Sequence, residues 1–308
     1  MLDPVSQTDW NLGTNLPPDQ GGQPELEPIL NRYAEEFAGP PLSRFEDIPG
    51  LVHTCLFFIL AILILFAGEL ATVAIGHQLP PFRHESYLSL ASDARLMIPA
   101  QALQYLILLG LTTVIFGAIW HHPFWKAIQW NFPAVGKRWI VLLAVGILLG
   151  LASSLASNYL PMPKEAPILN DLMHSTTGAW LMFVFGTTCA PLIEELAFRG
   201  FLLPSLTNTF RRWERSHRIS HAAAAMVGIP VSILLTSAPF ALLHSLQVSY
   251  AWAPVLLIGF VSIALCIVRL AMNSLAASTL VHATYNFCLF AGMLVASDGF
   301  RHLDKLNS

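Results

Sequence analysis

Charged side chains are scarce in this sequence. Asp, Glu, Lys and Arg make up 11% of the 308 residues, whereas apolar residues make up 55%. Such a composition excludes an ordinary soluble domain and is typical of a protein whose solvent is the lipid bilayer. It gives no indication of a nucleic-acid partner, because the formal net charge is −3 and basic residues form only local clusters in loops. The first partner that the sequence predicts is therefore membrane lipid.

Cysteine motifs and the common protease motifs are also missing. The four cysteines are Cys55, Cys189, Cys266 and Cys288. They lie in apolar runs without C-x-x-C spacing, which excludes a disulfide framework and a zinc knuckle and predicts small buried side chains. There is no H-E-x-x-H, since His84-Glu85 is followed by Ser-Tyr-Leu, and no G-x-S-x-G. Hydrolytic chemistry would have to come from a different set of residues.

The first 50 residues lack an apolar segment. They are rich in Pro and Gly and contain nine acidic residues against Arg32 and Arg44, which predicts a disordered acidic tail. A secretory signal is not expected, because the first apolar run begins only at Leu51 and not directly after a basic start.

Seven apolar segments follow the tail, each near the ~20 residues that a membrane-spanning helix needs. They are 51–76, 97–120, 139–160, 178–203, 222–246, 251–271 and 273–296. We therefore predict an all-α fold, a polytopic membrane helix bundle of about seven transmembrane helices. Its expected parts are two N-terminal helices within 51–138, a core over 139–297 and a C-terminal end over 298–308.

Basic residues in two loops predict the orientation of the bundle. Lys126, Lys137 and Arg138 lie between the second and third segments, and four arginines between Arg211 and Arg218 follow the fourth. Both loops should face the cytoplasm by the positive-inside rule, which puts the N-terminus there and the C-terminal end on the other side. The expected location is a cell membrane, the plasma membrane if the source is prokaryotic.

Three further features of the apolar segments have structural interpretations. Arg269, near the end of the sixth segment, fits a snorkelling position at the cytoplasmic interface. Glu69 is expected to snorkel at the outer end of the first segment. The Gly146-x-x-x-Gly150 spacing predicts close packing of the third segment against a neighbouring helix.

The fourth segment carries Glu194, Glu195 and Arg199 inside an apolar run. A charge near the bilayer centre costs about 2.5–3.5 kcal/mol on insertion scales, so such groups are functional candidates. On a helix Glu195 and Arg199 share a face and can pair, whereas Glu194 points about 100° away and has no local partner. A carboxylate without a matched cation in a dry site is suited to take and return a proton.

Polar pairs on two other segments can face Glu194. Phe240 and His244 lie four residues apart, as do His282 and Asn286, so each pair shares one helix face. A glutamate and a histidine can activate a water, and a second histidine with an amide can stabilise an oxyanion. Glu194, His244 and His282 would alternatively form a three-ligand zinc site.

The depths predicted for these residues disagree. Glu194 lies about nine residues from the expected cytoplasmic end of its helix, and His282 about ten residues from the start of its own. His244 falls near the outer end of the fifth segment if that helix is straight. A tilt or break around Gly228 and Pro230 would be needed to bring it level.

The three motifs together carry a family resemblance. In their order, Glu194-Glu195-x-x-x-Arg199, Phe240-x-x-x-His244 and His282-x-x-x-Asn286 resemble the CAAX protease and bacteriocin-processing (Abi) family of intramembrane endopeptidases, which includes the type II CAAX prenyl endopeptidases. The resemblance covers about residues 178–296. It implies that Glu194 is the general base, with His244 as its partner in holding the water. It also implies that His282 and Asn286 are oxyanion donors, with Glu195, Arg199 and Phe240 in support.

The function expected on this basis is hydrolysis of peptide bonds in membrane-associated or prenylated polypeptides. A glutamate mechanism without a cofactor is favoured, with a zinc-dependent one as its alternative. Two other functions remain open from the residues alone. One is a membrane regulator or scaffold without turnover, and the other is a proton- or metal-coupled transporter, which the lack of internal repeats disfavours.

Overall fold

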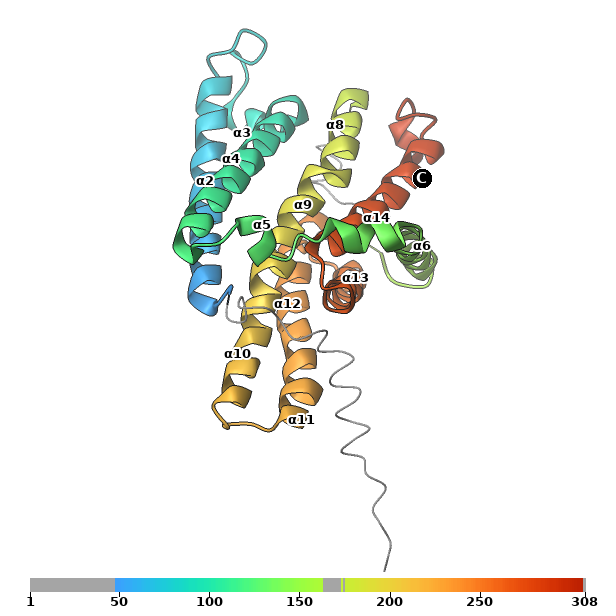
Figure 1. The fold of residues 1–308 in the computed structure, drawn as a ribbon. Coiled ribbons are helices and arrows are strands. Elements are labelled where there is room, and N and C mark those ends of the chain that lie inside the picture. Colours follow the sequence, from blue (N-terminus) through green and yellow to red (C-terminus); the bar gives the residue numbers. More distant parts are fainter. Residues whose placement is uncertain (1–47, 163–172, 174, 307–308) are drawn as a thin grey trace, which may run out of the picture.

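The computed structural model describes residues 48–162, 173 and 175–306. The predicted tail therefore lies outside the described residues up to position 47. The described part contains seven helices long and apolar enough to cross a membrane, and its arrangement is shown in Figure 1. The predicted all-α fold and the count of seven spans are confirmed, and the chain is a multi-pass integral membrane protein.

The first two spans form an antiparallel pair. Helix α2 (Leu51–Gly76) is joined through the short α3 (Tyr87–Leu90) to α4 (Ala94–Trp120). The two helices approach closely at Gly68, where an added Cβ would lie 2.6 Å from the Gln104 side chain. The Gln104 amide also reaches the Thr72 hydroxyl at 3.5 Å. A short helix, α5 (Phe124–Ala127), then leads into the third span.

A long helical column passes through the middle of the bundle (Figure 1). It consists of α8 (Thr176–Thr187), α9 (Cys189–Glu195), the π-helix η1 (Leu196–Leu202) and α10 (Leu203–Arg215). The predicted end of this span at residue 203 is wrong, because the column continues to Arg215. Apolar periodicity stops at residue 203, but α10 remains helical as an amphipathic extension that packs against α2 and α12.

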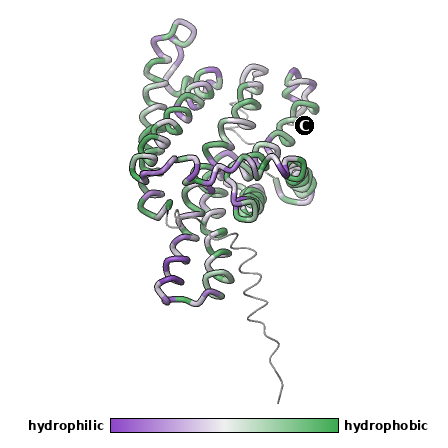
Figure 2. The backbone as a smooth tube through the Cα atoms, in the orientation of Figure 1, coloured by the Kyte–Doolittle hydropathy of each residue, from purple (hydrophilic) through white to green (hydrophobic). Residues whose placement is uncertain are grey.

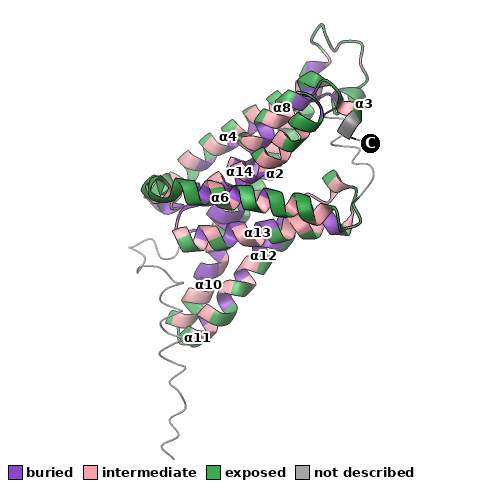
Figure 3. Cartoon of the chain, turned by 90° about the vertical axis from the view of Figure 1, so that its right-hand side faces the viewer, coloured by how far each residue is buried: buried purple, intermediate pink, exposed green. Residues whose placement is uncertain are grey.

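After the column, helix α12 runs back beside α10, and the later helices α13 and α14 cross the column (Figure 1). The chain turns through α11 (His221–Ala223) and a second π-helix, η2 (Ala224–Gly228), into α12 (Ile229–Leu243). A 3₁₀ turn, η3 (Leu246–Val248), precedes α13 (Trp252–Met272), α14 (Leu275–Ala296) and the terminal η4 (Leu303–Leu306). Figures 1 and 3 show α10 and α12 side by side below the crossing helices.

The third span, α6 (Phe132–Ser157), packs along α14. The contact depends on two glycines, because an added Cβ at Gly146 would lie 2.6 Å from Thr284 and one at Gly150 would lie 2.8 Å from Cys288. The close packing predicted from the Gly146-x-x-x-Gly150 spacing is thus present, and the partner helix is α14.

Apolar residues run along the membrane-spanning helices of the bundle, as the green stretches of the tube in Figure 2 show. Large apolar residues on α2, α4 and α6 are exposed on its outer surface, as the green faces in Figure 3 show. These are the faces that lipid would contact. The prediction of four buried cysteines is wrong: Cys266 is buried, Cys189 and Cys288 are half-buried, and Cys55 is exposed. An apolar run marks membrane depth but does not distinguish a lipid-facing side chain from a core one.

Candidate active site

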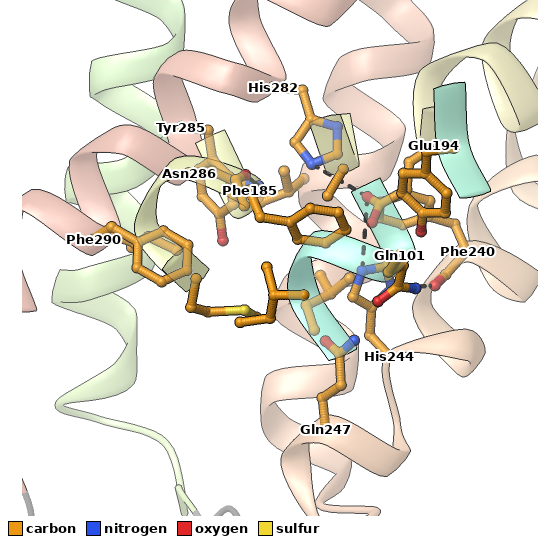
Figure 4. Close-up of a pocket in the computed structure, with 18 of the residues that line it drawn as sticks. Gln101, Phe185, Glu194, Phe240, His244, Gln247, His282, Tyr285, Asn286 and Phe290 are labelled. Carbon is orange, nitrogen blue, oxygen red and sulfur yellow. Dashed lines mark hydrogen bonds and ion pairs between the residues drawn. The ribbon is translucent and has the colours of Figure 1, made fainter. Parts of the chain in front are cut away.

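Three helices bring Glu194, His244 and His282 together. Glu194 lies in the last turn of α9, His244 caps the end of α12, and His282 lies in α14. The Glu194 Oε2 atom is 3.7 Å from the His282 Nε2 and 3.9 Å from the His244 Nε2. Figure 4 shows the carboxylate between the two imidazole rings. Residues separated by up to 88 positions in the sequence thus surround one small space.

The length of the central column removes the disagreement in depth between Glu194 and His244. Glu194 precedes Arg215, the end of α10, by 21 residues, and His244 follows His221, the start of α11, by 23. With a rise of ~1.5 Å per residue, both lie about 30–35 Å from the turn that joins the two helices. The disagreement arose because the helix end was placed at residue 203.

Hydrogen bonds fix the orientation of both imidazole rings. The Nδ1 of His244 is 2.8 Å from the Phe240 carbonyl oxygen, which can only accept, so the ring donates from Nδ1. The Nδ1 of His282 is 3.0 Å from the Glu195 Oε1 and donates to that carboxylate. In the neutral form of each ring the Nε2 lone pair therefore faces Glu194. The 3.7 and 3.9 Å gaps are too long for direct hydrogen bonds, so neither ring bonds to Glu194 directly.

Glu195 and Arg199 form the expected ion pair. The Arg199 Nη1 is 2.9 Å from the Glu195 Oε1, and both side chains have no exposed surface. Arg199 also donates to the Ser262 carbonyl at 2.9 Å and to its hydroxyl at 2.6 Å. Its guanidinium lies 4.5 Å above the Phe240 ring, a cation–π contact. Glu195 therefore connects Arg199 to His282 through a single carboxylate oxygen.

Asn286 lies on the same wall as His282, one turn further along α14. Its Nδ2 donates to the Gly186 carbonyl at 2.7 Å, which leaves one of the two amide hydrogens free to bind another group. Glycine at position 186 allows α14 to approach, since an added Cβ would lie 2.6 Å from the Phe290 ring. The carboxamide is thus held against α8 with its second N–H available.

A cavity of about 350 Å³ contains these residues. Its wall includes Glu194, His244, His282 and Asn286, and the rest of the lining is mainly apolar. Sequence reasoning missed four polar members of the wall: Gln101 and Tyr105 from α4, Gln247 from η3 and Tyr285 from α14. The signal available for the first two was a polar pair four residues apart within the apolar run 97–120.

The sequence predicted that Arg269 snorkels to the membrane interface, and this prediction is wrong. Its side chain is 3% exposed, and its Nε donates to the Arg199 carbonyl at 3.2 Å. Its Nη2 donates to the Gln129 amide oxygen at 2.6 Å. In η1 each backbone N–H bonds to the carbonyl five residues earlier, as the Leu203 N–H does to the Phe198 carbonyl. The corresponding partner of the Arg199 carbonyl would be residue 204, a proline without an N–H. The Arg199 carbonyl therefore needs the Arg269 side chain as its donor.

The side chains at the site match a zinc ion in type but not in spacing. Glu194, His244 and His282 offer one carboxylate and two imidazoles, the kind of ligands found in catalytic zinc sites. Ligand atoms 2.0–2.1 Å from a tetrahedral ion lie about 3.4 Å apart, which is closer than the 3.7 and 3.9 Å found here. Across the described chain, no group of three or more His, Cys, Asp or Glu side chains has the arrangement of a metal site. The ligand types suit zinc, whereas their spacing is too wide.

Comparison with protein families gives one match. Residues 176–288, from the start of α8 into α14, match the family described as Rce1-like, type II CAAX prenyl endopeptidase. No curated protein and no solved structure matches the chain. The matched range contains the Glu194, His244, His282 and Asn286 positions, whereas α2, α4 and α6 lie outside it.

Proposed function

We propose that this chain, whose residues 176–288 match the type II CAAX prenyl endopeptidase family, is an intramembrane endopeptidase that uses a glutamate-activated water. The observation that carries the proposal is the position of the Glu194 carboxylate between two imidazole Nε2 atoms, on the wall of a cavity. A water in this space can be polarised by a base and held by a histidine, as hydrolysis of an amide requires.

In the proposed reaction, Glu194 and His244 hold the water that attacks the scissile carbonyl carbon. Glu194 accepts one proton from this water while the new C–O bond forms, and the carbonyl oxygen becomes an oxyanion. The proton then passes to the amide nitrogen, the C–N bond breaks, and the products are a carboxylate and an amine. No covalent enzyme intermediate and no co-reactant other than water is needed.

His282 and Asn286 are proposed as the donors to the oxyanion. Asn286 can use the amide hydrogen that Gly186 does not take. His282 can donate from Nε2 only as an imidazolium, whose Nδ1 would keep its hydrogen bond to the Glu195 carboxylate. Removing one such donor costs about 10²–10³ in kcat in acyl-transfer enzymes with an oxyanion hole.

The proposed substrates are membrane-associated or prenylated polypeptides with a CAAX-type end. Two observations support this class: the family match, and the mainly apolar cavity within a multi-pass membrane bundle. A regulator or scaffold of the same fold without turnover is the alternative function, which the following experiment distinguishes.

The test is cleavage of a prenylated CAAX-type peptide by the purified full-length protein. We expect the wild type to release the C-terminal fragment and Glu194→Gln to lose at least 10²-fold in kcat, because the amide keeps the shape but cannot accept the proton. Glu69→Gln is the matched control, since Glu69 is an exposed membrane glutamate on α2 and does not line the cavity. A fully active Glu194→Gln protein would exclude this mechanism, and an inactive wild type would favour the scaffold.

A further inference from the structure

Gln101 and Gln247 differ in their surroundings from two other glutamines of the bundle. The Gln104 amide contacts Thr72 across the α2–α4 interface, and the Gln129 amide accepts from Arg269. Gln101 and Gln247 instead line the cavity, where the Gln101 side chain also interacts with the Tyr105 hydroxyl, and Figure 4 shows both glutamines near His244. They come from α4 and η3, two different walls of the same space, and Gln101 lies outside the range that the family model covers.

The charge of the cavity wall is one-sided. Among the described residues that line it there is no Lys or Arg, and Glu194 is the single carboxylate. The two nearby arginines are buried behind the wall, where Arg199 pairs with Glu195 and Arg269 donates to backbone and amide oxygens. A substrate carboxylate entering this space would be desolvated near Glu194 with no Lys or Arg in the wall to pair with it, which is unfavourable.

A carboxamide is well suited to a neutral peptide main chain. It offers two N–H donors and one carbonyl acceptor, the same groups that a peptide bond needs as partners. The cavity volume of about 350 Å³ lies at the lower end of the range for small-molecule sites, so it accommodates only a few residues around the scissile bond.

We propose that Gln101 and Gln247 bind the substrate main chain next to the scissile bond as an uncharged peptide, and that the cavity does not recognise a terminal carboxylate. The inference rests on the proposed function and specifies its substrate class: a peptide bond near the end of a chain, cleaved whether that end is a free acid or blocked. Gln101 and Gln247 are then specificity-determining residues.

The experiment compares two prenylated peptides that differ only at the C-terminus, one a free acid and one a carboxamide. We expect their kcat/KM values for the wild-type protein to agree within about twofold. Gln101→Leu should lower kcat/KM for both peptides by about tenfold, mainly through KM, because each loses the same hydrogen bonds. Gln101→Lys should favour the free acid by about tenfold or more, because it adds the missing cation.

Gln104→Leu is the matched control, because Gln104 lies on the same helix but faces α2. It should leave KM and the acid-to-amide ratio unchanged. A wild type that prefers the free acid by tenfold would overturn the inference, as would a Gln101→Leu variant that behaves like Gln104→Leu.

A binding measurement separates failure of the inference from failure of the proposed function. If the protein cleaves neither peptide, the proposed function is refuted, but the inference about Gln101 and Gln247 is not. The dissociation constants of the same two peptides then test the inference, since comparable binding weakened by Gln101→Leu supports it. Binding of the free acid only, of neither peptide, or without sensitivity to position 101 overturns it.

Discussion

Adjacent glutamates have different surroundings at this site. Glu194 faces the cavity and two imidazole nitrogens that do not bond it directly, whereas Glu195 is fully buried and bonded to Arg199 and His282. The 100° step between successive helix residues produces this division. One carboxylate is available for proton transfer, and the other holds the groups around it.

We predict that Glu195→Ala destabilises the protein by about 3–5 kcal/mol, because it leaves Arg199 as an unpaired buried charge. The measurement is thermal unfolding in detergent or bicelles, with Glu69→Ala as the control. The double variant Glu195→Leu with Arg199→Met should recover much of the lost stability but not the activity, since His282 still lacks its carboxylate partner. An unchanged melting temperature for Glu195→Ala would contradict the pairing argument.

The spacing of Glu194, His244 and His282 leads to a prediction about metal dependence. If Glu194 and His244 activate the water directly, activity should survive a membrane-permeant, zinc-selective chelator, and the pure protein should hold much less than one equivalent of metal. A zinc mechanism predicts loss of activity on chelation and its return with added zinc, because the metal lowers the pKa of the attacking water. Elemental analysis combined with peptide cleavage distinguishes the two.

At the scale of elements, the π-helix η1 separates Glu194 from the extension α10. Each of the two π-helices is followed at its second residue by a proline, Pro204 after η1 and Pro230 after η2. A proline removes an N–H donor, so a carbonyl in the preceding turn needs another partner. For Arg199 that partner is Arg269, which also binds Gln129, a residue with a left-handed φ of 58°.

We predict that Arg269→Met lowers stability by about 1–3 kcal/mol, because it leaves the buried Arg199 carbonyl without a donor. Arg138→Met is the control, since Arg138 is an exposed arginine at the kink near the start of α6 and we expect it to be nearly neutral. Thermal unfolding of both variants is the measurement. Equal stability of the two proteins would show that Arg269 does not support η1.

At the scale of the whole molecule, the seven spans of the described residues put the start of α2 and the end of α14 on opposite sides of the membrane. The arginines between Arg211 and Arg218 lie in the last residues of α10 and in the α10–α11 turn, which we predict to be cytoplasmic together with the N-terminus. Reporter fusions in this turn, before Met1 and after Ser308 test the orientation. The first two should report the cytoplasm and the third the opposite side. The same compartment for both ends would contradict the seven-span topology.

The sequence by itself determined the membrane class, the seven helices and the pairing of Glu195 with Arg199. Hydropathy identifies a spanning helix because every backbone polar group must be satisfied within the segment, and the four-residue spacing fixes which side chains share a face. These are local properties. They do not report how far an amphipathic extension such as α10 continues, so the depth of His244 was placed wrongly.

Only the tertiary structure decided which polar side chains face the cavity and which serve a helix contact. Gln101 and Gln104 lie three residues apart on α4, yet one lines the cavity and the other packs against Gly68. Arg269 has the position of an interfacial residue in the sequence but is buried against η1. In each case the outcome depends on the rotation and crossing of helices distant in the chain, which are set by side-chain packing between them and not by the composition of any single span.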